Sequence, residues 1–360
     1  MSKTEIVLSA DIHCFQHKKS TDRLNDCLEA LRWVFQTAIA NDVPNVAVLG
    51  DLFHHRYSIH VPTYQLVYEV LREYAGEKGL KVWLLVGNHD MWFHEKRNIS
   101  SIIPLQSIPN VTVINEPCTV DVGDYPASFL PYTANPAEDL KQIVPASGFK
   151  LLLGHVAVDG AILNAHAHTF SDVYVEQDGD MAKVTEGVFM GWNKVFLGHY
   201  HTPQVLNPVV EYVGSPLELC FSDTGQQKHV VIYDMKDHTQ RYVDNSFSPK
   251  HIVSKKEDLG QHNLNRAYLA LVSSDLTTPE FEDTCRDLMQ NHALRDVVVA
   301  PMKKVTKEET DFFQGSDAVK GNELQVTEKY IEWAEKQGKL EGLKKAKLLR
   351  MVNQVVQEVA

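Results

Sequence analysis

The amino-acid sequence predicts an α/β fold: a core of two layered sheets, then a small α/β unit and C-terminal helices. Three observations predict it. Apolar strands alternate with amphipathic helices over the first 90 residues, which is typical of a layered α/β core. Short strands separated by Pro, Gly and Asn follow between residues 111 and 233 and indicate a second sheet. From about Asn245 a strand–helix–strand pattern and then amphipathic segments replace them.

The first sheet is expected from three buried strands connected by helices. The strands are residues 5–10, 46–49 and 82–86, and the helices are residues 22–40 and 62–74. The first helix has one apolar face, made of Leu24, Leu28, Leu31 and Phe35. This order implies right-handed crossovers, so that polar residues after the strands meet at one edge of the sheet.

Seven short strands with few helices between them are expected to form the second sheet, packed against the first. They are residues 111–114, 119–122, 128–130, 150–153, 194–197, 211–213 and 229–233. Two of these strands end in a Gly-His pair, at residues 154–155 and 198–199. In this sheet too, apolar strands therefore place polar groups at their ends.

The chain divides into four parts in this interpretation. They are a core domain (1–245), a small α/β capping domain (246–305), a polar linker (306–325) and C-terminal helices (326–360). The small domain is predicted as strand, helix and strand over residues 267–272, 279–290 and 297–300. The tail is amphipathic: one helical face has Val326, Tyr330 and Trp333, and another has Leu348, Val352, Val355 and Val359.

Composition places the chain among ordinary globular proteins. Of its 360 residues, 44% are hydrophobic and 23% are charged, and no apolar run reaches the roughly 18 residues of a membrane span. Five widely spaced cysteines are typical of reduced thiols, and the first residues lead into a strand rather than a signal peptide. We therefore expect a cytoplasmic protein that does not contact a membrane.

The charge balance is acidic. The chain has 35 Lys and Arg against 47 Asp and Glu, a net charge of −12. Residues 301–360 are nearly neutral, whereas the first 300 residues have 24 basic and 37 acidic side chains. This balance argues against a protein that binds nucleic acid by bulk charge alone.

Histidines gather after the predicted strands, and 12 of the 17 lie within the first 201 residues. Five segments each follow a strand: Asp11-x-His13, Gly50-Asp51-Leu52-Phe53-His54, Gly87-Asn88-His89-Asp90, Gly154-His155 and Gly198-His199-x-His201. Carboxylate, amide and imidazole groups form a mixed donor set that suits divalent metals such as Mn, Fe or Zn, with no cysteine needed. A lone Asp-x-His is more often structural, but five such segments in this order favour a metal site.

Two adjacent metals that share a carboxylate are suited to the hydrolysis of a phosphate ester. Such a pair activates a water and clamps the phosphoryl oxygens as charge develops. A neighbouring proton donor then assists the leaving alkoxide. The motifs supply seven donor groups and two further histidines for these tasks.

The five segments resemble those of the calcineurin-like metallophosphoesterases. Gly-Asp-Leu-Phe-His at 50–54, Gly-His-Tyr-His-Thr-Pro-Gln at 198–204 and Tyr-Val-Gly-Ser-Pro-Leu-Glu at 212–218 are similar to the SbcD family, the nuclease subunits of double-strand-break-processing complexes. The resemblance is motif-level through residue 223 and architectural beyond it. Cys14-Phe15 stands where members often have Leu-Gly, and Asp223 where Glu is common, which indicates a divergent branch, bacterial or phage-encoded.

The resemblance implies a role for each motif residue. A first metal would be bound by Asp11, His13 and His201, and a second by Asn88, His155 and His199. Asp51 would bridge the two ions, for which Mn²⁺ is favoured and Mg²⁺, Fe²⁺ or Zn²⁺ are alternatives. His89 would donate a proton to the leaving 3′ oxygen, oriented by Asp90, and His54 would position the phosphate or the strand.

The same resemblance implies a metallophosphoesterase core that acts as a DNA exonuclease and endonuclease at DNA ends. The partners would be DNA and an SbcC-like SMC-type ATPase, and the chain would form a homodimer. The C-terminal helices would bind the ATPase, the alternative being that they pack on their own domain. No Walker-type loop is present in the sequence, so ATP hydrolysis would belong to the partner. The acidic charge then implies that the metals and the partner help to hold DNA.

Two other functions fit the motifs. One is a metallophosphoesterase that hydrolyses a small phosphodiester or nucleotide, although such an enzyme has little need of the small domain and the terminal helices. The other is a binding module with a decayed site, which the seven competent donor residues disfavour. The remaining histidines near the motifs, at positions 55, 60, 94, 166 and 168, are interpreted as loop or surface residues.

Overall fold

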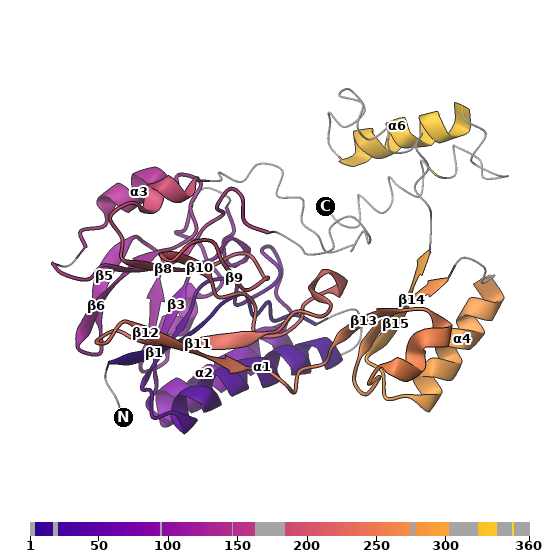
Figure 1. The fold of residues 1–360 in the computed structure, drawn as a ribbon, viewed down its shortest axis with the longest axis horizontal. Helices are drawn as coiled ribbons and strands as arrows, with labels where there is room; N and C mark the ends of the chain where they lie inside the picture. Colours follow the sequence, from indigo (N-terminus) through magenta and orange to yellow (C-terminus); the bar gives the residue numbers. More distant parts are fainter. Residues whose placement is uncertain are drawn as a thin grey trace. The chain divides into compact units, whose positions relative to one another are not determined.

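The computed structural model describes residues 4–16, 21–93, 96–145, 147–162, 184–273, 278–301, 323–336 and 348 (Figure 1). The chain separates into two compact units, residues 1–300 and 301–360. The larger unit contains two six-stranded sheets and one three-stranded sheet. None of the helices in these parts of the chain has both the length and the apolar character that crossing a bilayer demands.

The first sheet has the strand order β12-β11-β1-β2-β3-β4. Its strands are β1 (Glu5–Ser9), β2 (Asn45–Val48), β3 (Lys81–Leu85), β4 (Val111–Ile114), β11 (His229–Asp234) and β12 (Thr239–Asp244). The strands β1 to β4 are parallel, and β11 and β12 are antiparallel additions. The predicted parallel strands are confirmed. Residues 111–114 and 229–233, however, belong to this sheet and not to the second.

The second sheet has the order β5-β6-β7-β8-β10-β9. Its strands are β5 (Cys118–Val122), β6 (Tyr125–Leu130), β7 (Leu151–His155), β8 (Lys194–Gly198), β9 (Gln204–Val205) and β10 (Val210–Tyr212). The four central strands are parallel, and the two edge strands are antiparallel. Parallel strands buried on both faces read as continuous apolar runs, which is why β7 and β8 are recognisable in the sequence.

The two sheets pack face to face, as the sequence predicts. Successive side chains of a strand point to opposite faces. In β1, Ile6 and Leu8 face the second sheet, where they pack with Phe129, Leu153 and other residues of its inner face. The layered core therefore buries both faces of the first sheet.

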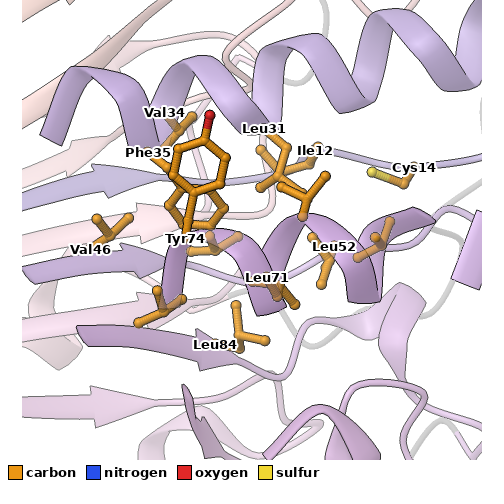
Figure 2. Packing of buried hydrophobic residues seen from close by; sticks show 14 of the residues in the cluster. Ile12, Cys14, Leu31, Val34, Phe35, Val46, Leu52, Leu71, Tyr74 and Leu84 are labelled. Atoms are coloured by element: carbon orange, nitrogen blue, oxygen red, sulfur yellow. The ribbon is translucent and has the colours of Figure 1, made fainter. Parts of the chain in front are cut away.

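The other face of the first sheet is covered by helices α1 (Asp22–Ala40) and α2 (Val61–Leu71), which a π-helical turn (Arg72–Glu77) extends. Figure 2 shows Phe35 of α1 beside Tyr74, over Val46 of β2. The two rings stack with their centroids 5.2 Å apart. The outer face of the second sheet has its own core, to which Leu140 of α3 (Pro136–Gln142) contributes.

A small α/β unit follows the two sheets. It has three strands, β13 (His251–Ser254), β14 (Tyr268–Ser273) and β15 (Asp296–Pro301), and the helix α4 (Thr278–Asn291). The prediction had two strands and omitted β13, which pairs in parallel with β14. The tetrapeptide His-Ile-Val-Ser of β13 is too short to give a pattern of its own.

This small unit is joined to α1 by a charged network around Asp26. The carboxylate of Asp26 is fully buried and accepts hydrogen bonds from Arg266 (3.0 Å), Arg295 (2.8 Å) and the hydroxyl of Tyr268 (2.8 Å). A buried charge requires such partners. The small sheet is therefore held in place on the same helix that packs against the first sheet.

The second compact unit contains helix α6 (Glu323–Lys336). Tyr330 and Trp333 lie on one face of it, with ring centroids 5.7 Å apart, as the helical spacing predicts. The helix begins three residues before the expected position 326, because Glu, Leu and Gln at 323–325 are good helix formers despite their polar character. The rest of the expected linker (306–322) and the tail beyond Lys336, except residue 348, lie outside the described residues.

Candidate metal centre

The five histidine-containing segments meet where the two sheets end. Because β1, β2 and β3 are parallel, the turns after them lie at one edge. The first two turns run side by side, since the N–H of Asp11 donates to the carbonyl of Gly50 (3.1 Å) and that of His13 to the carbonyl of Asp51 (3.0 Å). The second sheet joins them through His155, whose Nδ1 lies 2.7 Å from the carbonyl oxygen of Leu49.

One group of donor atoms lies after β1. Ligand atoms of Asp11, His13 and His201 are all within 4.8 Å of one another. The Nε2 atom of His13 is 3.1 Å from Nε2 of His201 and 3.6 Å from Oδ2 of Asp51. These are the three residues expected to bind the first metal, and Asp51, which is expected to bind both metals, lies next to them.

A second group lies toward the other sheet. Ligand atoms of Asp51, His155 and His199 are within 4.8 Å of one another. The Oδ1 atom of Asn88 is 3.0 Å from both Nε2 of His155 and Nδ1 of His199. Asp51 also lies between the groups, with Oδ2 3.3 Å from Nε2 of His155. The structure thus brings together all seven residues that the sequence analysis expects to bind metal.

The two remaining motif histidines flank the first group. Ligand atoms of His13, His54 and His89 form a third set within 4.8 Å. The Nδ1 atoms of His54 and His13 are 3.2 Å apart, and the rings of His54 and His89 lie 5.6 Å apart at an angle of 18°. The Nδ1–H of His89 donates to the carbonyl of His54 (2.6 Å), which holds its ring in place.

Asp90 connects the turns after β2 and β3. Its Oδ2 accepts the N–H of Asp51 (2.9 Å) and of Gly87 (3.0 Å), and its Oδ1 accepts the N–H of Phe53 (3.2 Å). Asp90 is expected from the sequence to orient His89. In the structure its carboxylate orders the backbone of the turns after β2 and β3, and the carbonyl of His54 contacts the ring.

The electrostatics of the site suit cations. Burial would raise the pKa of Asp51, but the neighbouring His155 and His89 outweigh it and hold that pKa well below its usual range. Burial lowers the pKa of His13 and His199 far below the usual value, so both imidazoles are neutral. Burial raises the pKa of Asp11 to about 7 in the absence of a cation. Burial would lower the pKa of His155, but the carboxylate of Asp51 outweighs burial and raises that pKa to about 9. Neutral imidazoles and an ionised carboxylate are the forms that bind metal, so His155 must release its proton when an ion binds.

This donor set fits two divalent ions. Oxygen and imidazole nitrogen converge with no sulfur among them, which suits Mn²⁺, Fe²⁺ or Zn²⁺. Two groups of donors share one central carboxylate, Asp51, which would bind both metal ions. The fit rests on residues from five separate strand ends.

Four of the expected ligands have a backbone conformation that L-residues seldom adopt. Asp11, His13, Asp51 and His199 have φ angles of 53°, 49°, 54° and 100°. Such conformations cost about 1–3 kcal/mol each and persist only where the surroundings impose them. The strain is located in the turns that aim the donor atoms.

Glycines before the ligands allow the segments to approach closely. A Cβ atom on Gly50 would lie 2.1 Å from Nδ1 of His155, and one on Gly87 would lie 2.1 Å from Oδ1 of Asp51. Gly50 also has a φ of 90°. Glycine is therefore required before Asp51 and before Asn88, because a side chain at either position would clash with a proposed ligand.

We expect Gly50→Ala to destabilise the protein by about 2–5 kcal/mol, because it adds a clash with His155 to the cost of a positive φ. Urea unfolding followed by circular dichroism measures this change. Gly79→Ala is the matched control: its φ is 78° but a Cβ there meets nothing within 4 Å, so only the conformational cost of about 1–2 kcal/mol remains. Equal losses in both variants would contradict the close approach.

One residue of the site was missed in the sequence. Lys228 is fully buried, and its Nζ donates to the carbonyl of His201 (2.8 Å) and to the hydroxyl of Ser215 (3.0 Å). Asp223, noted in the sequence only as a departure from the family, lies 3.5 Å from the same Nζ. A single Lys in a polar stretch before a strand gives no signal that it will be buried.

The other residues near the motifs have plainer environments. Arg97 is paired with Asp139 (2.6 Å) and Glu116 (2.8 Å). His55 is exposed beside Phe15, as expected for a surface residue, and its ring lies 4.7 Å from that of His54. His94, His166 and His168 lie outside the described residues.

Two known proteins are similar to this chain. The chain is similar to the SbcD subunit of the nuclease SbcCD of Staphylococcus saprophyticus subsp. saprophyticus, with 23% identity over 259 residues. The match covers 65% of this chain and 66% of the relative, just under two thirds of its length. A solved structure described as a novel archaeal phosphodiesterase matches 67% of this chain and 99% of its own, with 13% identity and a TM-score of 0.34.

The family comparison covers the two-sheet core. A model of the calcineurin-like phosphoesterases matches residues 4–214, which is more than half of the chain and includes all five motifs. The family implies phosphate-ester hydrolysis with divalent metal ions, and the buried cluster of Asp and His residues agrees with it. The chain therefore belongs to the calcineurin-like phosphoesterase family.

Proposed function

We propose that the protein is a two-metal-dependent DNA nuclease that cleaves phosphodiester bonds at DNA ends as an exonuclease and endonuclease. The observation that carries the proposal is the convergence of seven oxygen and nitrogen donors, from five strand ends, with two further imidazoles beside them. One ion would be bound by Asp11, His13 and His201. The other would be bound by Asn88, His155 and His199, and Asp51 would bind both ions.

The chemistry follows from these residues. Two divalent ions held by these residues, of which Mn²⁺ is the expected kind, would supply Lewis-acid chemistry to activate a water and offset charge on the phosphoryl group. His89 donates a proton to the leaving 3′ oxygen from Nε2, because its Nδ1–H is engaged by the carbonyl of His54. His54 positions the phosphate beside the first ion, since its ring lies against His13.

DNA is favoured over a small ester by the parts of the chain outside the core. The small unit at 246–305 would face DNA as a cap, and the C-terminal helices would bind the base of an SbcC-like SMC-type ATPase in the helix-in-groove mode. The similarity to SbcD of the SbcCD nuclease supports this choice. The complex would be built on a homodimer and would act in DNA repair and recombination in the cytoplasm of a bacterium, or of the host of a phage.

Nucleotide release from linear duplex DNA tests the proposal. The full chain, stripped of metal with EDTA and dialysed, should release nucleotides when Mn²⁺ is returned and none when it is withheld. The ATPase partner is included in a second arm, because the acidic chain is expected to bind duplex weakly alone. Hydrolysis of bis(p-nitrophenyl) phosphate with DNA left intact in both arms would overturn the DNA assignment in favour of a small phosphodiester.

A further inference from the structure

Two exposed aromatic side chains lie together close to the candidate metal centre. Tyr57 is 61% exposed and Trp92 is 45% exposed, although large rings are ordinarily covered. Their centroids are 5.3 Å apart with the planes at 90°. We call this pair the Tyr57–Trp92 platform. It presents aromatic surface to solvent from two separate turns.

Both residues of the platform lie close in sequence to a proposed catalytic histidine. Tyr57 follows His54 by three residues, and Trp92 follows His89 by three residues. Three residues span at most about 11 Å, so the backbone that bears each ring lies within that distance of a proposed catalytic histidine. The turn that bears Trp92 is ordered, because its N–H donates to the carbonyl of Ile99 (3.1 Å) and Met91 pairs with Ser100.

Other rings continue from the metal centre toward the surface. The ring of His54 lies 5.2 Å from that of His13, 4.5 Å from Phe15 and 4.7 Å from His55. Ring contacts therefore run from the buried His13, a proposed ligand, to the exposed His55 in the turn that leads to Tyr57. Nucleobases stack on aromatic surface whatever their identity, because every base has a π face.

Charge cannot be the main means of holding a substrate on this chain. The first 300 residues have 24 basic and 37 acidic side chains. Arg97, in the same turn region as Trp92, is already paired with Asp139 and Glu116. Stacking contributes about 1–3 kcal/mol per base without any net positive charge. An acidic nuclease gains most from this kind of contact.

We propose that the Tyr57–Trp92 platform stacks an unpaired nucleobase of the substrate beside the cleavage site. This inference rests on the proposed nuclease function and specifies its substrate: a single strand, or the frayed end of a duplex, with at least one base out of the helix. A base inside an intact duplex has no free face for the platform to meet.

Binding of a fluorescein-labelled oligothymidylate to the full chain in EDTA tests the proposal without hydrolysis. Trp92→Ala and Tyr57→Ala should each raise Kd about 5- to 150-fold, the range that corresponds to one lost stack. Trp92→Phe, which keeps a ring, should retain most of the affinity. An oligonucleotide of abasic sites should bind wild type and Trp92→Ala equally.

Ile99→Ala is the matched control, because Ile99 is a 51% exposed apolar residue beside Trp92 but has no ring. An equal loss in Ile99→Ala, or equal binding of thymidylate and abasic strands by wild type, overturns the proposal. A change of oligomeric state in Trp92→Ala, with the thymidylate-to-abasic ratio unchanged, also overturns it and assigns the platform to a contact between copies.

The two proposals fail in different ways. A chain that prefers thymidylate over abasic strands in EDTA but releases no nucleotides with Mn²⁺ contradicts the nuclease function alone. A chain that releases nucleotides with Mn²⁺ but binds both strands equally contradicts the platform alone.

Discussion

Replacing Asp51 with Asn is expected to lower phosphodiester hydrolysis by at least about 10³-fold while the fold is retained. Loss of shared Lewis-acid stabilisation is worth several kcal/mol, and each 1.4 kcal/mol is a factor of ten. Oδ1 of Asp51 accepts the N–H of His89 (2.8 Å), which an Asn oxygen can still do. Oδ2 faces His13 and His155. In Asp51→Asn it is replaced by an amide nitrogen, which is uncharged and does not bind a metal ion.

Metal content separates this effect from simple unfolding. Mn²⁺ bound per chain, measured by electron paramagnetic resonance, should fall from two in the wild type to one or none in Asp51→Asn. Asp124→Asn, an exposed Asp in the turn between β5 and β6, is the control and should bind two ions. Two ions and full activity in Asp51→Asn would contradict its role as a bridge.

The sequence predicts much of the fold because the central strands have simple patterns. β1, β2 and β3 are apolar runs with a polar turn after each, and α1 has a strict apolar face that fills the core in Figure 2. The edge strand β12 was missed, since its residues Thr-Gln-Arg-Tyr-Val-Asp are largely exposed and lack an apolar face. Sheet membership of β4 and β11 depends on pairing across long sequence separations, which no local pattern reveals.

The residues of the candidate site are also predictable only in part. The donor residues are predictable, because strand ends in parallel sheets converge and the residue types there are those that metals prefer. The residues that hold the donors are not. Lys228 reaches His201 across 27 positions of sequence, and Asp90 reaches Phe53 across 37, through contacts that exist only in the folded chain. The positive φ angles of Asp11 and Asp51 are likewise not predicted by any local sequence pattern.

Replacing His89 with Asn is expected to lower the rate of DNA cleavage by about 10²- to 10⁴-fold, the usual effect of losing a general acid. Nδ1 of His89 must bear a proton, because the carbonyl of His54 can only accept. Nε2 is therefore the nitrogen that gains and loses the transferred proton. Asn keeps a donor near the position of Nδ1 and removes Nε2, so the change is confined to proton transfer.

The leaving group distinguishes proton donation from a loss of metal. An alkoxide needs a proton as it departs, whereas p-nitrophenolate is a stable anion and needs none. His89→Asn should therefore lose its rate on DNA but keep most of its rate on bis(p-nitrophenyl) phosphate, with two Mn²⁺ still bound. His262→Asn makes the same chemical change at an exposed position in the small unit and should alter neither rate. Equal losses on both substrates would assign His89 to positioning the phosphate, since only a proton donor is sensitive to the leaving group.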